Sequence, residues 1–108
     1  MYRTHTCGEI RINHQNSQVT LAGWVQRVRN LGGMTFIDLR DRYGITQVVF
    51  EPHFNEDAHH EGKVLRGEYV VSIEGIVRKR PEGTENVSLS TGAIDVLVNK
   101  VVLLNSLL

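Results

Sequence analysis

Only one cysteine, Cys7, occurs in the 108 residues, so the chain cannot form an internal disulfide bond. Small secreted domains commonly depend on such bonds, and the sequence therefore favours a reducing compartment. No apolar run approaches the roughly 18 residues that a membrane-spanning helix requires, and the first residues lack the apolar segment of a secretory signal. We expect a soluble, cytoplasmic protein with no membrane partner.

The formal net charge is zero, because 12 Lys and Arg residues balance 12 Asp and Glu residues. Overall charge thus gives no indication of a nucleic-acid partner, and any electrostatic attraction must arise from local clusters. A hydrophobic content of 41% in 108 residues suffices for one core but not for two. We predict one domain that spans residues 1–108.

Known catalytic and metal-binding patterns are also absent from the sequence. Neither a GxSxG motif nor a phosphate-binding P-loop occurs, and nothing in the sequence places a base beside Cys7. His59 and His60 are adjacent, so in a helix their side chains diverge by about 100° instead of converging on a metal. We predict no catalytic residue, no metal site and no cofactor in these 108 residues.

Five β-strand patterns are present. Alternating and β-branched residues predict strands over residues 19–29, 34–41, 45–50, 68–79 and 93–104. Asn55 is a suitable N-cap for a short helix over residues 55–66, with acidic residues in the first turn and basic residues near the end. Thr6 is a candidate cap for a helical turn from Cys7 to Arg11. A long polar loop covers residues 81–92.

This order of elements predicts a mainly all-β fold, namely a five-stranded Greek-key OB-fold barrel with a short helix between the third and fourth strands. Gly23 and Gly75 lie inside the first and fourth strands, where a barrel needs corners or bulges. We interpret Trp24, beside Gly23, as a core residue or a cap of the barrel.

Strand alternation separates the two faces of the predicted sheet, because residues two apart share a side. Ile37 and Leu39 point inward, which leaves Phe36 outward with Asp38 and Arg40. In the next strand Val48 and Phe50 point inward and Gln47 points outward. An exposed ring stacks on nucleic-acid bases, and an amide forms hydrogen bonds with a base edge. This outward face is therefore a candidate surface for single-stranded nucleic acid.

Positive charge is concentrated in the same part of the chain. Residues 24–50 contain two aspartates and four arginines (Arg27, Arg29, Arg40, Arg42). Three more basic residues, Arg78, Lys79 and Arg80, follow at the end of a later strand. A domain with zero net charge can bind nucleic acid through such a patch. Two simpler explanations stand beside this one: a loop covers Phe36, and the arginines form a solvated face.

Several segments together resemble the N-terminal anticodon-binding domain of bacterial-type aspartyl-tRNA synthetase. They are RTHTCGEI (residues 3–10), VTLAGWVQRVRNLGGMTFIDLRDRYGITQVVF (19–50), GIVRKRP (75–81) and TGAIDV (91–96). The resemblance implies that the anticodon bases of the aspartate tRNA are splayed over the barrel face. It places Phe36 against the middle base, Gln47 at the edge of that base, and Asp95 at the first base, where the family usually has a glutamate.

Other positions correspond to approaches of the family toward the remaining base and the RNA backbone. We expect these contacts from Arg29, Leu31, Arg80 and the loop around Thr84 and Asn86, with further backbone charge from Arg27, Arg78 and Lys79. Leu31 resembles enzymes restricted to the aspartate tRNA, whereas Gly83 resembles enzymes that also charge the asparagine tRNA.

The resemblance further implies a longer parent enzyme, an aspartate–tRNA ligase that uses ATP and magnesium. The parent is expected to dimerise through its catalytic domain, which these residues do not include, and the isolated domain is expected to be monomeric. Three alternatives remain open from the residues alone. They are a free-standing OB-fold protein that binds single strands, the anticodon domain of a related lysyl or asparaginyl enzyme, and a barrel that binds protein.

Overall fold

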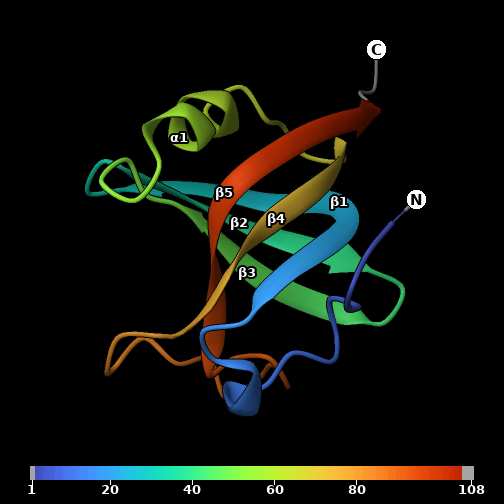
Figure 1. The fold of residues 1–108 in the computed structure, drawn as a ribbon, viewed down its shortest axis with the longest axis vertical. Helices are drawn as coiled ribbons and strands as arrows, with labels where there is room; N and C mark the ends of the chain where they lie inside the picture. Colours follow the sequence, from blue (N-terminus) through green and yellow to red (C-terminus); the bar gives the residue numbers. More distant parts are fainter. Residues whose placement is uncertain (1, 106–108) are drawn as a thin grey trace.

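Five strands close into one barrel in a computed structural model that describes residues 2–105 (Figure 1). The strands lie in the order β1-β2-β3-β5-β4, and every neighbouring pair is antiparallel except β3 and β5. The predicted barrel with a helix between the third and fourth strands is confirmed. The elements are η1 (Ile12–His14), β1 (Gln18–Leu31), β2 (Met34–Asp41), β3 (Gly44–Phe50), α1 (Glu56–Gly62), β4 (Val70–Lys79) and β5 (Ile94–Asn105).

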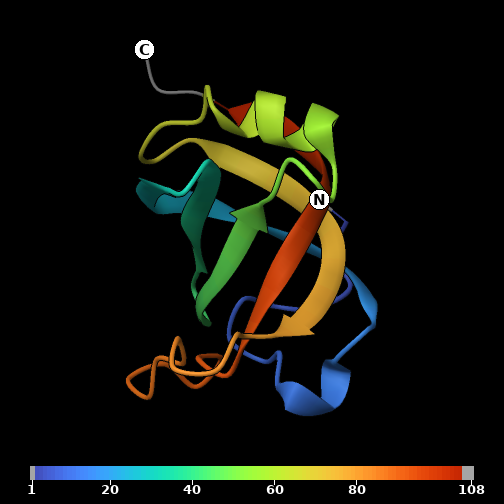
Figure 2. The same cartoon turned by 90° about the vertical axis from the view of Figure 1, so that its left-hand side faces the viewer.

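The helix α1 and the loop over residues 81–92 lie at opposite ends of the barrel, as the two perpendicular views show (Figures 1 and 2). Asn55 caps α1 as predicted, because its side-chain oxygen accepts the backbone N–H of Ala58 at 2.9 Å. The helix ends at Gly62 and not at Arg66. Gly62 packs so closely on Phe50 that a Cβ there would overlap the ring. The helix thereby covers one end of the core.

The strand β1 is long enough to pair with two neighbours, and it bends between them. It pairs with β4 as far as Trp24 and with β2 from Trp24 onward. At the bend, a Cβ on Gly23 would collide with the carbonyl oxygen of Arg40. The predicted corner is therefore confirmed. The interpretation of Trp24 as core or cap is wrong: Val25 points into the core, so the adjacent ring points outward and is 38% exposed.

Gly75 marks the corresponding corner of β4. The register between β4 and β5 shifts between Glu74 and Gly75, and a Cβ at Gly75 would collide with the carbonyl oxygen of Leu97. Inward-facing residues from all five strands fill the barrel behind these corners. The fully buried members include Val19, Leu21, Val25, Ile37, Leu39, Val48, Phe50, Val71, Ile73, Val77, Ile94, Val96 and Val98.

The segment before β1 confirms part of the prediction. Thr6 caps a turn over residues 7–9, because its hydroxyl oxygen accepts the Gly8 N–H at 3.4 Å and its own N–H donates to the Glu9 carboxylate at 2.6 Å. The turn does not extend to Arg11 as a helix, and the only helical segment before β1 in the described part of the chain is the 3-10 turn η1. The reason is tertiary. The backbone N–H of Cys7 donates to the Asp41 carboxylate at 2.8 Å, and the Cys7 carbonyl accepts the hydroxyl of Thr46 at 2.7 Å. These bonds to the barrel hold the backbone at Cys7, so the local bonding stops after one turn.

Candidate nucleic-acid interface

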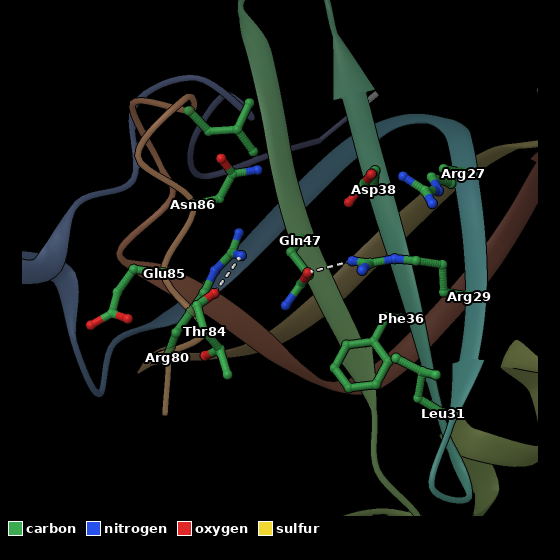
Figure 3. A pocket seen from close by; sticks show the side chains of 11 residues that line it. Arg27, Arg29, Leu31, Phe36, Asp38, Gln47, Arg80, Thr84, Glu85 and Asn86 are labelled. Atoms are coloured by element: carbon green, nitrogen blue, oxygen red, sulfur yellow. Dashed lines mark hydrogen bonds between the residues drawn. The ribbon is translucent and has the colours of Figure 1, made fainter. Parts of the chain in front are cut away.

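A cavity of about 430 Å³ opens on the outer face of β1, β2 and β3, with the 81–92 loop as its wall (Figure 3). This volume is in the range of natural ligand sites. It brings together seven of the ten predicted site residues, namely Arg27, Arg29, Leu31, Phe36, Gln47, Arg80 and Asn86. Asp38, Thr84, Glu85 and Leu89 complete the lining.

Phe36, Arg29 and Gln47 form the floor of the cavity. Phe36 lies directly opposite Arg29 in the β1–β2 register, and the Arg29 guanidinium lies 5.8 Å from the centre of the ring. Arg29 also donates a hydrogen bond of 2.9 Å from Nη2 to Oε1 of Gln47 (Figure 3). This bond occupies the amide oxygen and turns the amide nitrogen away from Arg29, so Gln47 presents a donor to the cavity.

Arg80 fastens the wall of the cavity to the barrel. Its Nε donates to the carbonyl of Ile94 at 2.8 Å and its Nη1 donates to the carbonyl of Thr84 at 3.4 Å. Only 5% of Arg80 is exposed, and this burial lowers the pKa of its guanidinium below the ordinary value. Within the loop, the Asn86 N–H donates to the Gly92 carbonyl at 3.0 Å. The wall is therefore a bonded structure whose shape depends on Arg80.

Asp95, Arg78 and Lys79 lie outside the cavity lining, although the sequence places them in the site. Asp95 and Arg78 are direct partners in the β4–β5 register. Both carboxylate oxygens of Asp95 accept from Arg78, at 2.9 Å from Nε and 2.7 Å from Nη2, and Asp95 is 1% exposed. This hydrogen-bonded pairing raises the pKa of the Arg78 guanidinium. The outward parity of Asp95 is correct, but its neighbour covers it.

Two lining residues, Glu85 and Leu89, have no signal in the sequence, because they belong to an irregular loop. Asp38 had such a signal, since alternation puts it on the same face as Phe36. Three arginines and two carboxylates face this cavity. With one aromatic ring beside them, the cavity can hold an unstacked base, offer donors to its edge and attract phosphate.

A family described as "OB-fold nucleic acid binding domain", of the tRNA anticodon type, matches residues 19–104. The chain belongs to this family. The chain is similar to many aspartate–tRNA ligases, including the following two. It is 53% identical over 104 residues to the aspartate–tRNA(Asp/Asn) ligase of Oleidesulfovibrio alaskensis, covering 96% of this chain and 17% of that protein. It is 50% identical to the aspartate–tRNA ligase of Bacteroides thetaiotaomicron, covering 98% of this chain and 18% of that protein.

Among solved structures, the asparaginyl-tRNA synthetase of Pyrococcus horikoshii, in complex with asparaginyl-adenylate, has the same fold with a TM-score of 0.81. The two are 28% identical, and the match covers 99% of this chain and 23% of the other. The chain spans less than a fifth of the length of the two aspartate–tRNA ligases.

Residues 2–105 contain no helix long and apolar enough to cross a membrane. In that described part of the chain no group of three or more His, Cys, Asp or Glu side chains is arranged to hold a metal ion.

Proposed function

We propose that this OB domain recognises the anticodon loop of the aspartate tRNA for a longer aspartyl-tRNA synthetase. The observation that carries the proposal is the floor of the cavity, where an aromatic ring, a guanidinium and an amide nitrogen face the same space. Stacking on an aromatic ring contributes about 1 to 3 kcal/mol per base and accepts any base. Sequence preference must then come from Gln47 and the arginines around the ring.

Each lining residue has a role in this proposal. The middle anticodon base stacks on Phe36, and the Gln47 amide, held by Arg29, donates to its edge. Leu31, which is 58% exposed at the end of β1, packs against the sugar or the next base. Arg80 and Asn86 contact the remaining base through the loop wall, and Arg27 contacts the backbone. For Asp95 to read the first base directly, the neighbouring side chains must move aside, because only 1% of the Asp95 side chain is exposed.

The chain would act within a larger enzyme. Residues 1–108 would be one anticodon-binding domain, and the ATP-dependent aspartylation of tRNA, with its magnesium, would take place on residues elsewhere in that enzyme. We expect the enzyme to be a cytoplasmic homodimer through its catalytic domain and this domain to be monomeric by itself. Relatives named for the aspartate tRNA alone and for both aspartate and asparagine tRNAs are similarly close, at 50% and 53% identity.

A titration tests the proposal directly. An RNA hairpin with the aspartate anticodon loop is added to the 108-residue protein, and amide chemical shifts are followed alongside an identical stem with a scrambled loop. We expect tighter binding of the aspartate loop, with shifts concentrated at Phe36, Gln47 and the 81–92 loop. Equal affinity for both hairpins would instead indicate a single-strand binder without sequence preference. Absence of binding at low salt would overturn any nucleic-acid role.

A further inference from the structure

A second group of aromatic and cationic side chains lies away from the cavity, at the turn between β2 and β3. Tyr43 occupies this turn and is 55% exposed. The Arg3 guanidinium lies 5.5 Å from the centre of the Tyr43 ring, and the Arg42 guanidinium lies 5.6 Å from it. Neither arginine forms an ion pair within residues 2–105, where the one ion pair joins Arg78 to Asp95. The cluster therefore carries two exposed positive charges without a carboxylate partner.

Hydrogen bonds hold together the two backbone segments that carry this cluster. The Asp41 carboxylate accepts three backbone N–H groups, from Cys7 at 2.8 Å, from Tyr43 at 2.8 Å and from Gly44 at 3.1 Å. These bonds fix the turn that carries Tyr43 and tie it to the N-terminal segment that carries Arg3. Gly8 completes the junction, because a Cβ there would collide with the Tyr43 carbonyl. The two arginines thus come from separate backbone segments that these bonds hold together, with both guanidinium groups beside the same ring.

The outer face of β2 connects the cavity with this cluster. Its outward side chains are Phe36 and Asp38, which line the cavity, and then Arg40. Arg40 lies opposite the exposed Trp24 of β1 and donates to the Gln26 side chain at 2.9 Å. Six positions separate Phe36 from Arg42, which corresponds to about 20 Å of extended chain. A polymer bound in the cavity can therefore continue along this face to Tyr43.

We propose that the cluster of Arg3, Arg42 and Tyr43 binds the phosphate backbone of the stem that carries the loop held in the cavity. This inference rests on the proposed function. Arginine offers a planar set of donors suited to phosphate, and stacking on a ring leaves the edges of that plane free. Phosphates advance about 3.4 Å along each strand of a duplex, so about 20 Å corresponds to about six of them. The stem of a small hairpin is of this length.

The test compares two RNA ligands and two double variants. The ligands are the aspartate anticodon hairpin with its stem and the single-stranded loop oligonucleotide without it. In Arg3→Gln/Arg42→Gln we expect a three- to tenfold weaker affinity for the hairpin at low salt. The slope of log affinity against log salt should fall by about two, one for each lost phosphate contact. Affinity for the loop oligonucleotide should be unchanged.

A matched control removes the same charge elsewhere. Arg66 and Lys100 are exposed and lie outside both the cavity lining and the cluster, so Arg66→Gln/Lys100→Gln should bind both RNAs like the original protein. An unchanged hairpin affinity and salt slope in the Arg3/Arg42 variant would overturn the stem contact and leave the proposed function intact. Equal losses in the two variants, or equal losses for both RNAs, would also overturn it. Failure of the original protein to bind either RNA would overturn both proposals.

Discussion

Arg78 on β4 donates to both carboxylate oxygens of Asp95 on β5, but the two side chains are very unequally buried. Asp95 is 1% exposed, whereas the Arg78 side chain is 33% exposed. A carboxylate in this position depends on its partner for compensation of its charge, while the guanidinium can also reach water. Removal of Arg78 should therefore destabilise the protein more than removal of the Asp95 charge.

The first prediction follows from this asymmetry. Arg78→Met leaves a buried carboxylate without a partner and should lower the free energy of unfolding by about 3 kcal/mol. Asp95→Asn leaves a guanidinium that turns to solvent and should cost about 1 kcal/mol. Urea unfolding of both variants measures the difference. The double variant should cost less than the sum of the two single changes, and equal costs for the single variants would contradict the prediction.

The second prediction concerns the ring at the floor of the cavity. Phe36→Ala should weaken binding of the aspartate anticodon hairpin by about 1 to 3 kcal/mol, because the base loses its stacking partner. Phe36→Tyr keeps the aromatic face and should retain most of the affinity. Phe36→Leu keeps apolar volume without that face and should resemble Phe36→Ala. Fluorescence titration gives the affinities, and thermal unfolding shows whether each variant is folded. Full affinity in Phe36→Ala would remove Phe36 from the site.

The third prediction is a dependence of stability on pH. Burial raises the pKa of the Cys7 thiol far above its ordinary value, and the Asp41 carboxylate raises it further. In the unfolded chain the thiol ionises near pH 8.5, whereas in the folded chain it stays protonated. The unfolded state thus binds fewer protons above pH 8.5. Stability should fall there by about 1.4 kcal/mol per pH unit because of this one group.

Cys7→Ala supplies the comparison for that effect. It removes the thiol and keeps every other titrating group, so the difference between the two proteins isolates Cys7. Urea unfolding at pH 7.5 and 9.5 should show the steeper loss of stability in the original protein. Identical losses in the two proteins would show that Cys7 titrates normally in the folded state.

The fourth prediction concerns the cap of α1. Asn55 accepts the N–H of Ala58 and also donates from its amide to the Asn99 carbonyl at 3.3 Å, which links the helix to β5. Asn55→Ala removes both bonds and should lower the free energy of unfolding by about 1 to 2 kcal/mol. Asn55→Asp keeps the cap and loses only the donor, so it should cost less. Chemical unfolding ranks the variants, and the reverse order would contradict the assigned role of the cap.

The floor of the cavity could be predicted from the sequence because strand alternation alone decides which side chains face outward. Phe36 and Gln47 were placed correctly in this way, since the inward neighbours Ile37 and Val48 leave them no other side. In the β2–β3 register Phe36 pairs with Val49 and Gln47 pairs with Asp38. The bond between Gln47 and Arg29 could not be predicted, because it needs the relative register of β1 and β3 through β2.

The pairing of Asp95 with Arg78 had no such local signal. It depends on the β4–β5 register, and that register is shifted at Gly75 by a bulge whose size is not written in the alternation. The turn before η1 is shorter than predicted for a similar reason, because the partner of Cys7, Asp41, lies 34 positions away. The prediction for Trp24 is wrong because the inward position of Val25, and not the size of the indole ring, decides which way Trp24 points.

The parallel pairing of β3 with β5 has a consequence for how the fold forms. This pairing joins Val48 to Val96 and encloses the 81–92 loop in the chain between them. Strand pairs so distant in sequence form slowly, because the closure entropy of the intervening chain precedes any gain. We therefore expect the cavity, which needs both the paired strands and the 81–92 loop, to form only when the barrel closes. Acquisition of RNA affinity during refolding should follow barrel closure with the same rate constant.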